Sequence, residues 1–201
     1  MTKKSSTVIL DLDNTITDFQ QTLNNMAEIL GVEPVRTEDI TDYDFMMKYD
    51  MTEAGDRIFW RVFEPTLIRN AVLAENRYNY IKNHIIPKNS KIIIVTARPE
   101  NLKYDTERWL ANNSVEYDEL HLIGHGANKL LYILKELKII PDMIIEDKPS
   151  IFTEVLDLRR FQCYLPNIIT VCIDYEYNKN TPCEIRLDRD TGELIKRETV
   201  K

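Results

Sequence analysis

The fold of this chain is decided by the stretch VILDLDNT at residues 8–15. Residues 8–10 form an apolar run that predicts a buried strand, and Asp11 and Asp13 follow it two positions apart. Burying a carboxylate without a partner is costly, so two of them at the end of a strand usually mark a bound cation or a catalytic task. The alternative is a strand followed by an Asp-rich turn with solvated carboxylates.

Three more polar groups accompany apolar runs further along the chain. Thr96-Ala97-Arg98-Pro99 follows the run at 92–95, Lys129 opens an apolar-periodic segment, and Glu146-Asp147 follows the run at 143–145. Ligands of a doubly wound parallel sheet bind at the carboxyl ends of its strands. Polar side chains that follow several such strands can therefore converge on one crevice.

In this order the motifs resemble those of the haloacid dehalogenase (HAD) superfamily, whose members are mostly magnesium-dependent phosphatases. DLDNT at 11–15 is similar to the DxDxT signature, and Thr96, Lys129 and Glu146-Asp147 stand at the positions of the family's later motifs. The resemblance covers about residues 6–175. It implies an α/β fold, with a Rossmann-like parallel sheet and a small helical cap inserted after the first strand.

The resemblance also implies a role for each residue. Asp11 would be the nucleophile that forms an aspartyl-phosphate, and Asp13 would be the acid and base that serves the leaving group and then the attacking water. Thr96, the backbone N–H groups of Ala97 and Arg98, and Lys129 would hold the phosphoryl oxygens.

A Mg²⁺ ion is the cofactor that the resemblance implies. Hard oxygen ligands and a substrate phosphate suit this ion, which offsets the repulsion between a carboxylate and a phosphate. Asp11 and Asp147 would be side-chain ligands, Asp13 would contribute its backbone carbonyl, and Glu146 would orient these ligands from behind.

Composition favours an ordinary globular protein, and the net charge favours a small substrate over a polymer. The 201 residues are 43% hydrophobic and 29% charged, and the net charge is −7. A protein that grips a long nucleic acid normally has a basic face, so we expect a small phosphate ester instead. No apolar run approaches the roughly 18–20 residues of a membrane span. Cys163, Cys172 and Cys183 have no metal-ligand spacing, so we expect reduced thiols in the cytoplasm.

Alternating strands and helices are expected along the chain. Apolar runs predict strands at 7–12, 91–96, 119–123, 142–146 and 168–173, and periodic segments predict helices at 100–113, 127–138 and 149–158. Alternation around Asp190-Thr191-Gly192 predicts a C-terminal hairpin at about 183–198. The hairpin could be an appendage, an ordered tail or a contact within a homodimer.

The segment between the first two motifs is far longer than the roughly 30 residues of one crossover. We therefore expect a helical cap at 18–85, and a catalytic core at 1–17 and 86–201. Helical periodicity supports the cap: one stripe begins at Phe19 and closes at Gly31, and a second runs over about 70–84. Between them lie many aromatic residues. They could form the core of the cap, or some of them, with Phe45, Phe59 and Trp60 as candidates, could stack on a planar substrate.

The phrases at 59–65 and 144–149 are similar to those of the 5′-deoxyribonucleotidase branch, which dephosphorylates nucleoside monophosphates. Three motifs depart from that branch: Asn14-Thr15 replaces Gly-Val, Ala97-Arg98 replaces Ser-Pro, and Glu146 replaces Asp. TARPE at 96–100 is similar instead to the 3′-phosphatase domain of polynucleotide kinases. A non-catalytic phosphate-binding protein is a third possibility, which the presence of both Asp11 and Asp13 disfavours.

Overall fold

A seven-stranded sheet forms the centre of the computed structural model, which describes residues 6–36, 39–43, 53–161 and 168–197. The strand order is β5-β4-β1-β6-β7-β8-β9, and every neighbouring pair is parallel except β8 and β9. The strands are β1 (Thr7–Leu10), β4 (Lys91–Thr96), β5 (Glu119–Leu122), β6 (Met143–Glu146), β7 (Ile169–Ile173), β8 (Ile185–Leu187) and β9 (Leu194–Arg197). The α/β fold class and the parallel sheet expected from the sequence are confirmed.

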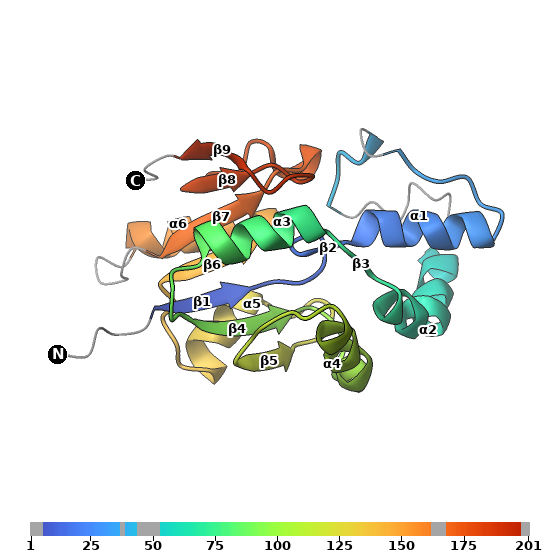
Figure 1. Cartoon of the computed structure of the whole chain (residues 1–201), viewed down its shortest axis with the longest axis horizontal. Coiled ribbons are helices and arrows are strands. Elements are labelled where there is room, and N and C mark those ends of the chain that lie inside the picture. Colours follow the sequence, from blue (N-terminus) through green and yellow to red (C-terminus); the bar gives the residue numbers. More distant parts are fainter. Residues whose placement is uncertain (1–5, 37–38, 44–52, 162–167, 198–201) are drawn as a thin grey trace.

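Helices cover both faces of the sheet (Figure 1). On one face, α3 (Glu75–Tyr80), the π-helical turn η3 (Ile81–Ile85) and α4 (Lys103–Asn112) pack over Val8 and Leu10. On the other face, α5 (Lys129–Leu131), the π-helical turn η5 (Tyr132–Glu136) and α6 (Pro149–Phe161) pack over Ile9. Successive strand residues therefore enter opposite hydrophobic clusters, which explains why the strands read as continuous apolar runs. None of the described helices combines the length and apolar character of a membrane span.

A separate helical unit stands beyond the carboxyl ends of the central strands (Figure 1). It contains α1 (Phe19–Ile29) and α2 (Glu53–Arg69), and its own hydrophobic cluster includes Phe19, Leu23 and Leu67. A short antiparallel ribbon of β2 (Thr17–Asp18) and β3 (Val72–Leu73) joins it to the sheet. We call this unit the cap.

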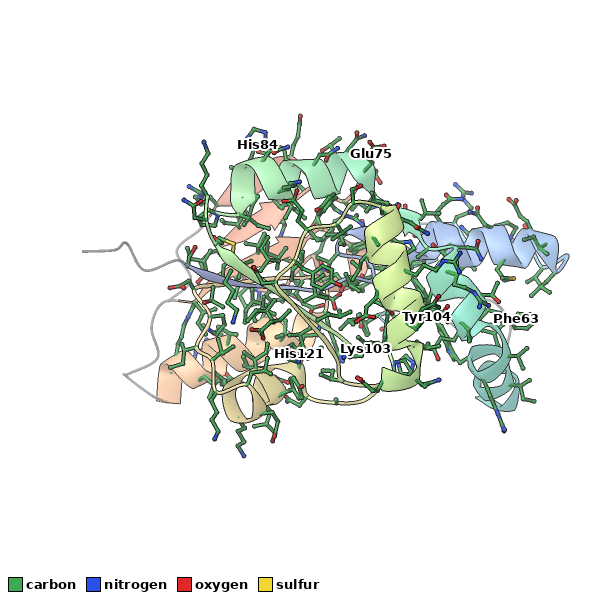
Figure 2. The ribbon with its side chains drawn as sticks, turned by 60° about the horizontal axis from the view of Figure 1, so that its bottom comes forward. Phe63, Glu75, His84, Lys103, Tyr104 and His121 are labelled. Carbon is green, nitrogen blue, oxygen red and sulfur yellow. The ribbon has the colours of Figure 1, made fainter. Side chains whose placement is uncertain are left out.

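The second helical stripe packs on the central sheet. Tyr78 and Ile81, in α3 and η3, share a hydrophobic cluster with Val8 and Leu10 of β1. In Figure 2, Glu75 and His84 mark this helix on one side of the sheet, whereas Phe63 marks α2 in the cap. We therefore propose that the cap ends at the β2–β3 ribbon rather than at residue 85.

The C-terminal hairpin is part of the sheet and of the core. β8 extends the sheet beside β7, and the turn before β9 lies against α3. Arg77 of α3 is buried, donates to the Thr17 carbonyl at 2.7 Å and to the Tyr175 hydroxyl at 3.2 Å, and also donates to the Arg189 carbonyl in this turn. Arg77 thus connects the hairpin with Thr17, the first residue of the β2–β3 ribbon that leads to the cap.

Gly192→Ala is expected to lower the free energy of unfolding by about 2 kcal/mol or more. Gly192 has φ +77°, and a Cβ there would lie 2.6 Å from Arg77 Cα, so backbone strain and a clash would add. Gly31→Ala is the matched control, because Gly31 has φ +71° but nothing within 4 Å of a Cβ, and it should cost only about 1 kcal/mol. Chemical denaturation measures both losses, and equal losses would contradict the close approach of the hairpin to α3.

Candidate functional site

Three acidic side chains meet where the central strands β1 and β6 end. Asp11 follows β1, Glu146 ends β6, and Asp147 comes next; all three are buried. Each offers a carboxylate oxygen, and these oxygens lie within 4.8 Å of one another. The sequence brings them together because β1 and β6 are neighbouring parallel strands, paired from Val8–Met143 to Leu10–Ile145. We call these residues the acidic cluster.

Lys129 supplies a positive charge to the acidic cluster from the start of α5. Its Nζ lies 2.5 Å from Asp11 Oδ1 and also contacts Glu146 Oε2. Burial opposes the charge on Lys129, but Asp11 and Glu146 outweigh it and raise the pKa of the ammonium group. Lys129 therefore stays charged, and its ammonium group contacts the side chain predicted to be the nucleophile.

The carboxyl groups of the acidic cluster outnumber the ammonium group of Lys129. Burial raises the pKa of Asp11 to about 7, Glu146 adds to the rise, and Lys129 opposes it. Burial, followed by Glu146 and Asp11, also raises the pKa of Asp147 well above its usual range. Three buried carboxylates face one ammonium group, and oxygen donors of this kind suit a hard divalent cation. The residues present therefore fit the metal site that the sequence implied.

Backbone and tyrosine donors orient Glu146 and Asp147. Glu146 Oε1 accepts from the backbone N–H groups of Asp147 at 3.2 Å and Lys148 at 3.3 Å. The Tyr177 hydroxyl lies 2.5 Å from Asp147 Oδ2. Burial raises the pKa of Tyr177 well above its usual value, so this hydroxyl keeps its proton and donates to Asp147.

Asp13 lies apart from the acidic cluster and pairs with Arg98. Arg98 Nε donates to Asp13 Oδ2 at 2.9 Å, and Nη2 donates to Oδ1 at 2.6 Å. Arg98 is buried, with its guanidinium 5.7 Å from the ring centroid of Trp109 and 3.4 Å from Thr106 Oγ1. No local pattern in the sequence connects the Arg98 side chain with Asp13, so only the backbone N–H of Arg98 could be assigned a role from the sequence.

A cavity of about 210 Å³ opens beside these groups. Its lining contains the four residues predicted to be catalytic, Asp11, Asp13, Thr96 and Lys129. Ala97, which was predicted to bind substrate, lines it as well, together with Tyr43 and Lys148. The Tyr43 ring meets Tyr177 edge-on with centroids 5.6 Å apart, and Lys148 Nζ lies 5.4 Å from its centroid. Tyr43 is therefore an aromatic residue at the cavity that the sequence analysis did not single out.

Two of the aromatic residues proposed for substrate stacking, Phe59 and Trp60, lie in the cap. Trp60 stacks on Phe19 with centroids 6.0 Å apart, and Phe59 meets the edge of Trp60 at 5.7 Å. Both pack against the hydrophobic cluster of the cap, and neither lines the cavity. Phe45 lies outside the described residues. Of the cysteines, Cys172 and Cys183 are free and buried, whereas Cys163 lies outside the described residues.

His125 joins the cap to the loop that follows β5. Its Nε2 lies 2.6 Å from Glu64 Oε1 of α2, and its ring centroid lies 6.1 Å from that of Trp60. The next two residues along the loop, Gly126 and Ala127, line the cavity. His125 thus connects the cap to a loop that lines the cavity. No spacing in the sequence predicted this contact.

Removing this contact with Glu64→Gln should lower the melting temperature more at low pH than at high pH. Glu64 raises the pKa of His125 above 6.5, so the contact is fully stabilising below pH 6.5 and weakens as the pH rises through the raised value. The imidazole is half exposed, so we expect at most about 1 kcal/mol. Thermal unfolding across this range measures the effect. Glu116→Gln is the control, because it breaks an exposed ion pair with Lys82 that contains no histidine, and its effect should not change across this pH range. A pH-independent loss in Glu64→Gln would contradict the ion pair.

Comparisons with known proteins agree with this architecture. No family model matches the chain. "Putative nucleotidase YqfW" of Bacillus subtilis (strain 168) is 26% identical over 124 residues, and the match spans 60% of this chain and 61% of that protein. The chain thus spans about three fifths of the length of this curated relative.

Two solved structures are similar to the chain at low sequence identity. A "putative beta-phosphoglucomutase" from Thermotoga maritima is 14% identical with a TM-score of 0.51, covering 93% of this chain and 96% of its own. A HAD-superfamily hydrolase of subfamily IA from Geobacter sulfurreducens is 12% identical with a TM-score of 0.45, covering 87% and 94%. By its sheet, the chain shares the α/β fold of the Thermotoga maritima structure, and the order of its strand-end motifs resembles that of the HAD superfamily.

Proposed function

We propose that this protein is a Mg²⁺-dependent phosphomonoester hydrolase that acts through an aspartyl-phosphate on Asp11. One observation carries the proposal: the Asp11 carboxylate lines a cavity, contacts Lys129, and lies within the acidic cluster at the carboxyl ends of adjacent parallel strands. A carboxylate that attacks a phosphate needs nearby positive charge, and Lys129 supplies part of it.

Asp11 and Asp147 are the proposed side-chain ligands of Mg²⁺, and Asp13 is proposed to contribute its backbone carbonyl. When bound, the ion supplies charge neutralisation between the attacking carboxylate and the phosphate. Glu146 is proposed to hold Asp147 and Lys129 in place. One of its oxygens accepts hydrogen bonds from the backbone N–H groups of Asp147 and Lys148, and the other accepts from Lys129.

The proposed reaction has two steps. An Asp11 oxygen bonds to phosphorus while the bond from phosphorus to the ester oxygen breaks, and Asp13 gives its proton to that leaving oxygen. Water then attacks the phosphorus, Asp13 takes a proton from it, and Asp11 is released with inorganic phosphate. Lys129, Thr96 and the backbone N–H groups of Ala97 and Arg98 are proposed to hold the phosphoryl oxygens. Arg98 donates one hydrogen bond to each oxygen of Asp13, and the second lone pair of Oδ2 is proposed to carry the proton.

A nucleoside 5′-monophosphate is the proposed substrate. The name of the Bacillus subtilis relative supports a nucleotide, and the net charge of −7 supports a small ester over a long nucleic acid. Since Phe59 and Trp60 pack within the cap, Tyr43 is the stronger candidate for an aromatic contact with the base. We further propose that the protein acts in the cytoplasm.

Phosphate release from a panel of substrates tests this function. The panel contains nucleoside 5′- and 3′-monophosphates, sugar phosphates and a 3′-phosphorylated oligonucleotide, each with Mg²⁺ or with EDTA. We expect fastest release from 5′-monophosphates, dependence on Mg²⁺ and little dependence on salt. Preferred release from the oligonucleotide, falling steeply as salt rises, would indicate a 3′-phosphatase instead. No release from any substrate would contradict the proposed activity.

A further inference from the structure

The segment that follows β7 holds the metal-ligand candidate Asp147 at two points. Besides the hydrogen bond from the Tyr177 hydroxyl to Asp147 Oδ2, Asn178 Nδ2 donates to the Asp147 backbone carbonyl at 2.8 Å. Tyr177 and Asn178 belong to the short helix η6 (Glu176–Asn178), at the carboxyl end of β7. Both the side chain and the backbone of Asp147 are therefore fixed from one neighbouring element.

The same segment reaches the loop that carries Asp11 and Asp13. Tyr175 donates its hydroxyl to the Asn14 carbonyl at 3.1 Å. Its ring is stacked on that of Tyr177, with centroids 5.0 Å apart and planes at 7°. The two stacked rings thus connect the loop after β1 with the loop after β6, and these two loops carry the acidic cluster.

This segment is itself held firmly. Asn178 is buried, and its Oδ1 accepts from the Tyr175 backbone N–H at 3.0 Å and from Arg186 Nη1 at 3.2 Å. Arg186 of β8 also pairs with Asp174 at 2.8 Å. A buried network in which the members are hydrogen-bonded can hold side chains in a single arrangement.

We propose that Tyr177, stacked on Tyr175, is a positioning residue that orients Asp147 for a divalent cation and fixes its separation from Asp11. The inference rests on the metal site of the proposed function. The Tyr177 hydroxyl occupies one oxygen of Asp147, which leaves the other to face the acidic cluster and removes the rotation of the carboxylate. Partners that lie behind metal ligands typically contribute a factor of about 10–100 to metal affinity.

Tyr177→Phe tests the inference, because it keeps the ring and its stacking but removes the hydroxyl. Binding of Mn²⁺ to the full chain, followed by electron paramagnetic resonance, and of Mg²⁺, followed by calorimetry, should weaken about ten-fold or more. With the preferred substrate, excess Mg²⁺ should restore kcat to near the wild-type value. A purely structural role would lower the melting temperature without this selective loss of metal affinity.

Tyr78→Phe is the matched control. Its hydroxyl is also a buried hydrogen-bond partner, accepting from the Glu116 backbone N–H at 3.1 Å, but it lies in α3 away from the site. It should leave metal affinity unchanged. If Tyr177→Phe does not fold, Tyr175→Phe should weaken metal binding several-fold, since it frees the Asn14 loop. If Tyr177→Phe folds and its metal affinity is unchanged, the inference is wrong but the proposed metal site still stands. The same holds for Tyr175→Phe if that variant has to be used. A wild-type protein that binds neither ion would overturn both the inference and the proposed metal site.

Discussion

Asp11→Asn is expected to lower phosphate release by about 10⁴-fold or more, because it removes the attacking oxygen and a ligand of the cation together. The amide keeps the shape of the carboxylate in its buried position, so the variant should fold normally. Steady-state phosphate release at saturating Mg²⁺ measures the loss, and circular dichroism confirms the fold.

Asp142→Asn is the matched control for this substitution. Asp142 precedes β6 at the opposite end of the sheet, where its Oδ2 accepts from the Thr7 backbone N–H at 2.8 Å. The same chemical change there should leave turnover unchanged. Phosphate release by Asp11→Asn at a rate near that of the wild type would remove the basis of the proposed mechanism.

Lys129→Met is expected to lower kcat/KM by roughly 10²–10³-fold, the usual cost of removing one group that stabilises developing charge. The position of Nζ between Asp11 and Glu146 supports this expectation. The pH dependence should change as well. Lys129 lowers the pKa of Asp11, so its loss should raise that pKa. Asp11 must be ionised to attack, and the rise of kcat/KM with pH should therefore move to higher pH.

Two variants separate this effect from a loss of stability. Lys82→Met breaks an exposed 2.9 Å ion pair with Glu116 and should leave both kcat/KM and its pH profile unchanged. Lys129→Arg keeps the positive charge and should restore part of the activity. A Lys129→Met protein with the wild-type pH profile would show that the ammonium group does not act on Asp11.

The sheet and the acidic cluster could be predicted because both depend on local sequence and one general rule. Apolar runs that are buried on both faces identify parallel strands, and polar residues after them must gather where the strands end. That rule placed Asp11, Glu146 and Asp147 together. It could also have pointed to Tyr175 and Tyr177, which follow the run at 168–173 in the same way.

Pairings across the chain could not be predicted from one sequence. The bond between Arg98 and Asp13 joins two distant loops and leaves no local pattern. The periodicity of α3 shows that the helix has an apolar face, but it does not show which surface that face packs against. The same pattern is therefore expected for a helix on the sheet and for a helix in the cap. Similarly, an aromatic residue such as Trp60 is as suited to a cap core as to a binding site, and only the structure separates it from Tyr43.

The central claim is that Asp11 carries the phosphoryl group during turnover. The most direct measurement is to mix the protein with Mg²⁺ and its preferred substrate, quench in acid within the first turnover, and locate the phosphoryl group by peptide mass spectrometry. We expect it on Asp11 in the wild type and on no peptide of Asp11→Asn. Phosphate release that proceeds while Asp11 stays unmodified, or with the label on another residue, would contradict the claim.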